Sequence, residues 1–233
     1  IQISSFSSCG PTDDGRIKPD IVGNGVNLTS TTSSGTTAYT SLSGTSMSAP
    51  NVSGSLVLLQ ELYSQKNAGA FMRSATLKAL VLGTATEAGA NPGPDYIYGW
   101  GLLNTEAAAK TILSRNTTSL ISESSLAQSA TQTLNLIASG NGPLVATICW
   151  TDPEATPVPT ANALDNATLR LVNDLDISVK DNQNNTYRAW ILDPANPSAP
   201  ATTGDNFRDN VEQVYIANAT PGKSYTLTIS HKN

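Results

Sequence analysis

The sequence predicts a chain in two parts, an α/β segment followed by an antiparallel β-sandwich or jelly roll. In the first part, apolar residues recur at the spacing of helices that pack on one face. In the second part, they alternate with polar residues, and turns rich in Pro, Asn and Gly separate the runs. We expect the α/β part at 1–113, a linker or first edge strand at 114–130, and the β part at 131–233.

The composition argues against two classes of partner. The net charge is -5, and Lys and Arg form no block, so we expect neither nucleic acid nor an acidic membrane surface as a partner. No apolar run approaches the ~20 residues that a membrane-spanning helix needs. The low charge and the many hydroxyl and amide side chains favour a secreted protein. Cys9 and Cys149 lie far apart, and we expect two free thiols rather than a disulfide.

Helical spacing appears three times in the first part, after strands and turns in 1–45. Residues 46–64 are expected to form a helix, in which Gly54 predicts close packing against another backbone. A second helix fits 74–85, and a third fits about 104–113 with Asn104 as its N-cap. The apolar stripe of the first helix consists of Val52, Leu56, Leu59 and Tyr63.

Alternation marks the strands of the second part. It appears in LVATICW at 144–150, in LRLVNDLDISVKD at 169–181 and in SYTLTIS at 224–230. In the middle stretch the apolar residues share one face, and Asp174 and Asp176 lie on the other. Antiparallel strands with such loops between them are typical of a β-sandwich or jelly roll.

Ser46 stands in the stretch GTSMSAP, at the expected start of the first helix. A serine there has its oxygen beside unpaired backbone N–H groups and the positive end of the helix dipole, donors that can hold an oxyanion. Gly44 permits a tight approach, and Pro50 is tolerable if it falls in about the first turn. The plainer interpretation is that Ser46 only caps the helix.

Several stretches together resemble the subtilisin-like serine proteases, the subtilase family. GTSMSAP matches the nucleophile signature of that family, except that Ser48 stands where alanine is usual. The segments that flank this signature in the family are matched by SSFSSCGPTDDGRIKPDIV before it and YGWGLLNTEAA after it. Two departures occur: Cys9 replaces the usual arginine, and Gly23-Asn24-Gly25 replaces Ala-Pro-Gly. The turn at Gly23-Asn24-Gly25 is therefore expected to be looser. In the second part, ATICWTDPEA, LVNDLDISV and DNFRDNVEQVYI resemble the C-terminal β-barrel of large alkaline, oxidatively stable subtilases.

The resemblance implies the C-terminal half of an α/β subtilisin-like catalytic domain, followed by an all-β antiparallel jelly-roll or β-sandwich domain. It implies a secreted serine endopeptidase acting on proteins or peptides, with Ser46 as nucleophile and its own N–H as an oxyanion donor. The catalytic Asp and His of the family have no counterpart here, so the chain alone is expected to be inactive and its missing N-terminal half is an expected partner. His231 is expected to be a surface residue and no base.

A calcium site is a further expectation. Asp152, Asp174 and Asp176 supply the oxygen ligands that calcium prefers, and related enzymes bind calcium in this barrel. The alternative is a solvated face in which the carboxylates pair with Arg170 and Lys180. For the chain as a whole, the rival function is a non-catalytic binding or scaffold module whose functional part is the β-barrel.

Overall fold

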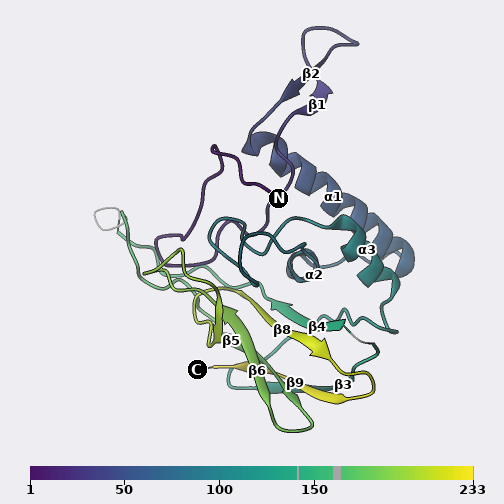
Figure 1. The fold of residues 1–233 in the computed structure, drawn as a ribbon, viewed down its shortest axis with the longest axis vertical. Coiled ribbons are helices and arrows are strands. Elements are labelled where there is room, and N and C mark those ends of the chain that lie inside the picture. Colours follow the sequence, from purple (N-terminus) through teal and green to yellow (C-terminus); the bar gives the residue numbers. More distant parts are fainter. Residues whose placement is uncertain (141, 160–163, 233) are drawn as a thin grey trace.

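A computed structural model describes residues 1–140, 142–159 and 164–232 of the chain. Helices precede a group of strands, and a hairpin projects from the helical end of the molecule (Figure 1). The hairpin and helices are β1 Leu28–Thr31, β2 Tyr39–Leu42, α1 Thr45–Lys66, α2 Ser74–Gly83 and α3 Thr105–Leu113. The strands that follow are β3 Thr131–Ile137, β4 Gly142–Cys149, β5 Leu175–Asp181, β6 Thr186–Ile191, β7 Thr202–Gly204, β8 Val211–Ala219 and β9 Ser224–His231.

Helix α1 buries only one side of its surface. Leu59 and Tyr63 of the predicted stripe are buried, whereas Val57 and Leu58 are 67% and 61% exposed. The prediction that Gly54 packs closely against another backbone was wrong, because a Cβ atom there would meet nothing within 4 Å. Gly54 precedes Val57 and Leu58 by three and four residues and so lies on the same exposed face.

The other two helices begin close to where their sequences predict. Asn104 caps α3, because its side-chain oxygen accepts a hydrogen bond from the backbone N–H of Ala107 at 2.9 Å, as predicted. Helix α2 ends at Gly83, and the hydroxyl of Thr84 donates to the carbonyl of Leu80 at 2.7 Å. This hydrogen bond satisfies one carbonyl of the last helical turn.

Besides the β1–β2 hairpin, the described strands form two antiparallel sheets. One has the order β3-β9-β5-β6-β7, and the other pairs β4 with β8. In the first, Leu175 lies opposite His231 and Ile177 opposite Ile229. Apolar residues from both sheets form one buried cluster, to which β5 contributes Val179 and β8 contributes Val214. The sheets therefore pack on each other through their apolar faces.

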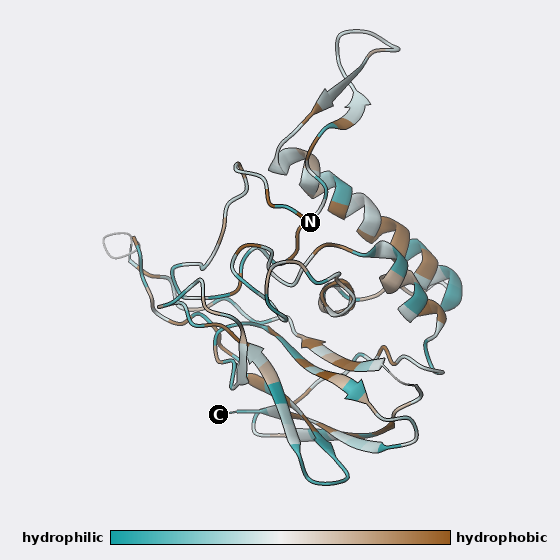
Figure 2. Cartoon of the chain, in the orientation of Figure 1, coloured by the Kyte–Doolittle hydropathy of each residue, from teal (hydrophilic) through white to brown (hydrophobic). Residues whose placement is uncertain are grey.

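The β4–β8 pair lies between the helices and the larger sheet, and β4 contacts α2 (Figure 1). Figure 2 shows hydrophobic residues on β4 and along α1. The core around the helices includes the buried Leu59 and Trp100, and Val211 of β8 belongs to the same cluster. Because this core draws on helices and strands alike, the segments before and after 114–130 are packed together.

Candidate active site

Ser46 is the second residue of α1, and its side chain is exposed. Its hydroxyl and its backbone N–H form no hydrogen bond with any residue that the structure describes. A free N–H in the first turn of a helix is a donor for an anion, and the helix dipole adds to that attraction. The geometry therefore places an accessible hydroxyl beside a backbone N–H that is free to bind an anion.

The backbone immediately before Ser46 has a shape that glycine alone adopts readily. Gly44 has φ 154° and ψ 165°, and its carbonyl accepts hydrogen bonds from the N–H groups of Met47 at 3.0 Å and Ser48 at 3.2 Å. The N–H of Gly44 donates to the carbonyl of Gly25 at 2.8 Å. These bonds fix the turn from which α1 begins.

The Gly23-Asn24-Gly25 turn packs against the first turns of α1. The hydroxyl of Ser48 donates to the carbonyl of Gly23 at 2.9 Å. A Cβ atom on Gly23 would lie 2.7 Å from Cγ2 of Val52 and 3.1 Å from the Ser48 oxygen. Absence of a side chain at position 23 therefore leaves the space in which the serine hydroxyl and the carbonyl meet.

Pro50 lies deeper in α1 than expected from the sequence. It is the sixth residue of the helix rather than a member of its first turn. Because proline has no N–H, the carbonyl of Ser46, four residues earlier, has no helical donor from that position.

The described residues place no base beside Ser46. His231 lies in β9, well separated from the start of α1 along the long axis of the molecule (Figure 1). His231, expected at the surface, is only partly exposed, and its buried Nδ1 atom has no hydrogen-bond partner among the described residues. Its backbone N–H donates to the carbonyl of Ala130 at 3.0 Å.

The predicted calcium ligands separate into two places. Asp174 and Asp176 come together with Asp205, their carboxylate oxygens within 4.8 Å of one another. The carboxylate of Asp152 instead accepts hydrogen bonds from the backbone N–H groups of Val172 at 2.7 Å and Asn173 at 2.8 Å. The group found by the structure therefore contains a residue that sequence reasoning missed and lacks one that it named.

A lysine occupies the centre of this aspartate group. The Nζ atom of Lys232 lies 3.0 Å from Asp174 and 2.9 Å from Asp176, and it also pairs with Asp205. Burial alone lowers the pKa of Lys232, but the hydrogen bonds to Asp205, Asp176 and Asp174 outweigh it and raise that pKa above its usual value. The predicted calcium set does not fit this arrangement, because Asp152 is bound elsewhere and an ammonium group lies among the other carboxylates.

Glu212 is a fully buried acid near the same group. Its Oε2 atom accepts a hydrogen bond from the N–H of Ile177 at 2.7 Å, whereas its Oε1 atom has no partner among the described residues. Burial raises the pKa of Glu212 to about 8, and the charges of Asp176 and Asp174 add to that rise. Glu212 is therefore largely neutral at pH 7.

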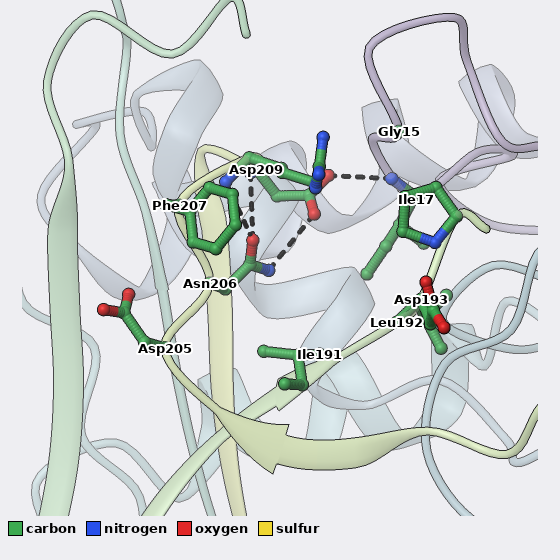
Figure 3. A pocket seen from close by; sticks show the side chains of 11 residues that line it. Gly15, Ile17, Ile191, Leu192, Asp193, Asp205, Asn206, Phe207 and Asp209 are labelled. Atoms are coloured by element: carbon green, nitrogen blue, oxygen red, sulfur yellow. Dashed lines mark hydrogen bonds between the residues drawn. The ribbon is translucent and has the colours of Figure 1, made fainter. Parts of the chain in front are cut away.

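A cavity of about 220 Å³ lies between the N-terminal segment around Ile17 and the loop 205–209 (Figure 3). Asp209 spans this junction, because its Oδ1 atom accepts from the N–H of Ile17 at 2.9 Å and its Oδ2 atom from Asn206 at 3.1 Å. Burial raises the pKa of Asp209. None of the predicted site residues lines this cavity, which marks a contact between the two parts of the chain.

Both cysteines are free, as predicted. Cys9 is exposed, whereas Cys149 at the end of β4 is half-buried and packs against the core around the helices. Burial raises the pKa of the Cys149 thiol. In the described parts of the chain, no helix is both long enough and apolar enough to span a membrane.

Comparison with known proteins shows that the first part of the chain is similar to proteases. Residues 1–101 match the subtilase family, so that this segment, with Ser46 at the start of α1, is subtilase-like. The C5a peptidase of Streptococcus pyogenes serotype M1 is 50% identical over 62 residues, which cover 27% of this chain and 5% of that protein. The PII-type proteinase of Lactococcus lactis subsp. cremoris is 41% identical over 66 residues, 28% of this chain and 3% of that proteinase.

The chain thus spans a small fraction of the length of these relatives. The family match and the names of the relatives support a chain related to serine proteases.

Proposed function

We propose that the chain is part of a secreted subtilisin-like serine endopeptidase in which Ser46 is the nucleophile. The observation that carries this proposal is the exposed hydroxyl of Ser46 at the first turn of α1, which no described residue hydrogen-bonds, within the segment that matches the subtilase family. Proteins or peptides are the proposed substrates.

In the proposed reaction, the Ser46 oxygen attacks a peptide carbonyl and forms an acyl-enzyme, which water then hydrolyses. The backbone N–H of Ser46 stabilises the oxyanion. A histidine outside this chain takes the hydroxyl proton and returns it to the leaving amine. Without that base, turnover falls by several powers of ten, so we propose that the chain alone is inactive.

The partner that supplies this base is the proposed N-terminal half of the catalytic domain. The exposed apolar side chains of α1, Val57 and Leu58, offer a surface for it to cover. Residues 1–113 are the proposed remainder of the catalytic domain, and residues 131–233 are the proposed jelly-roll or β-barrel domain.

A chimera tests the nucleophile. The chain is expressed behind the N-terminal half of an active subtilase that carries that family's catalytic aspartate and histidine. Casein hydrolysis is expected from the chimera and not from its Ser46→Ala variant, nor from the chain alone. Cooperative thermal unfolding, followed by circular dichroism, shows that both chimeras fold.

A folded chimera that hydrolyses casein equally well with Ser46→Ala would refute the role of Ser46. Ser46-dependent hydrolysis by the chain alone would refute the proposed inactivity. A folded chimera without any activity would favour the alternative, a binding or scaffold module that acts through its β-barrel.

A further inference from the structure

We propose that Asp174, Asp176 and Asp205 form a cation site that the chain fills with its own Lys232 ammonium, in place of a metal ion. An ammonium group has three N–H donors. Lys232 pairs with each of the three carboxylates, at 3.0 Å for Asp174 and 2.9 Å for Asp176. Donors and acceptors are therefore matched one to one.

The register of the β5–β9 pair places Lys232 next to the carboxylates. Leu175 lies opposite His231 in the β5–β9 pair, so Asp174 and Lys232 are the next facing residues, and the N–H of Lys232 donates to the carbonyl of Asp174 at 2.8 Å. Asp176 is two residues further along β5 and is the diagonal neighbour on the same face. Asp205 comes from the loop after β7.

Lys232 also neutralises part of the negative charge of the carboxylates around it. The side chains of Lys232, Asp174 and Asp176 are 25–30% exposed, so water screens their attraction only in part. Glu212 adds no full charge at neutral pH, and its buried Oε1 atom has no hydrogen-bond partner among the described residues. Among the described residues, Lys232 is the cation that pairs with all three aspartates, so removing it would leave their carboxylates close together without a counter-ion.

The site has a consequence for the junction between the two parts of the chain. Asp205 begins the loop in which Asp209 binds the N–H of Ile17, and Arg208 donates to the carbonyl of Asp14 at 2.6 Å. By holding Asp205, Lys232 fixes one end of this loop. Loss of the ammonium is expected to loosen the contact with the N-terminal segment as well as the end of β9.

The test compares thermal unfolding of the full 233-residue chain with that of Lys232→Met, in chelator and in millimolar calcium chloride. The wild-type melting temperature is expected not to change with calcium. Lys232→Met is expected to melt about 2–4 °C lower in chelator. It is expected to recover most of that loss in calcium, because the divalent ion binds the carboxylates that the lysine has left.

Two further variants serve as controls. Lys180→Met removes an exposed lysine of β5 and is expected to leave both the melting temperature and the calcium response unchanged. Lys232→Arg retains the positive charge and is expected to remain insensitive to calcium, which keeps the proposal testable if Lys232→Met does not fold.

Two results would overturn the proposal. A wild-type chain that melts several degrees higher in calcium would mean that the metal ion, not Lys232, is the cation of this site. Equal melting temperatures for wild type and Lys232→Met, without a calcium response in either, would mean that the aspartates are ordinary solvated charges.

Discussion

At the scale of single residues, Glu212 has a carboxyl group whose protonation depends on folding. Its pKa is raised to about 8 by burial, whereas the usual value is 4.5. Between these values the folded chain binds a proton that the unfolded chain releases. The stability that this protonated carboxyl contributes is therefore complete below about pH 4.5 and is lost as the pH rises toward 8.

We predict that Glu212→Gln removes this loss, because glutamine is similar in shape and cannot ionise. Relative to wild type, the variant should gain stability between about pH 5 and pH 8. Urea unfolding across this range measures the difference, and Glu154→Gln is the control at an exposed position. Parallel stability curves for wild type and Glu212→Gln would contradict the prediction.

Gly23 and Ser48 are predicted to act as a coupled pair. Ser48→Ala removes one hydrogen bond and should cost about 1 kcal/mol of stability. Gly23→Ala should cost about 1–3 kcal/mol, because its Cβ would crowd Val52 and the Ser48 oxygen. In the double variant the hydroxyl is gone, so the combined loss should be smaller than the sum of the two.

Gly25→Ala is the matched control for this cycle. A Cβ atom there would lie 2.8 Å from the carbonyl oxygen of Gly44 and 3.1 Å from Cβ of Ser48. Both atoms remain when Ser48 is replaced by alanine, so this pair should be additive. Chemical unfolding of the variants supplies the energies, and strict additivity for Gly23 with Ser48 would count against coupling.

At the scale of elements, the segment 114–130 supplies the cap of α2. The carboxylate of Glu123 accepts from the N–H of Arg73 at 2.9 Å and from the hydroxyl of Thr76 at 2.5 Å. Arg73 precedes the helix and offers no cap of its own. Glu123 thus satisfies donors that the helix start leaves unpaired and adds a negative charge at the positive end of the dipole.

We predict that Glu123→Ala destabilises the chain by about 1 kcal/mol, the usual cost of a lost helix cap. Glu106→Ala removes an exposed glutamate paired with Lys110 four residues later, and it should cost less. Thermal unfolding of both variants makes the comparison. If both lose the same stability, Glu123 is no more than a surface charge.

The elements were predictable where one local rule decides them. Helical spacing located α1 and α2, and Asn104 marked the start of α3. Strand β5 begins only at Leu175, although the apolar residues at 169 and 171 extended the predicted pattern. Strand β8 is buried at successive positions because it contributes to both cores: Val211 belongs to the core around the helices, and Val214 belongs to the core between the sheets. Its buried residues therefore do not alternate with exposed ones.

The candidate sites, like the elements, were predictable only where local sequence decides the structure. Ser46 could be proposed from the sequence because the residues around it in the chain are also its neighbours in space. The partner of Asp174 is Lys232 rather than the expected Arg170 or Lys180, and Arg170 instead donates to the carbonyl of Thr156 at 2.8 Å. Strand register decides this pairing, because β9 brings Lys232 to Asp174, which lies 58 residues earlier in the chain.

At the scale of the whole molecule, the exposed face of α1 is predicted to cause self-association. Val57 and Leu58 on this helix are more than half exposed. In a Val57→Ser, Leu58→Ser double variant, less apolar surface is available for contacts between copies. Light scattering should show a shift toward monomer, with little change in melting temperature, because neither side chain belongs to the core.

A monomeric wild-type chain at high concentration would contradict this prediction. Leu59→Ser is the contrasting variant, because Leu59 is buried. Its replacement should unfold the chain rather than dissociate oligomers into monomers.

Because the two cysteines differ in burial, thiol labelling can measure the rate at which the fold opens locally. A thiol reagent should modify the exposed Cys9 at once, since its sulfur is open to solvent. Cys149 is half-buried against the core around the helices, so it should react more slowly, and fastest when the end of β4 separates from that core. The second labelling rate, followed at increasing reagent concentration until it reaches a plateau, would then report how often the two parts of the chain come apart, without any introduced probe.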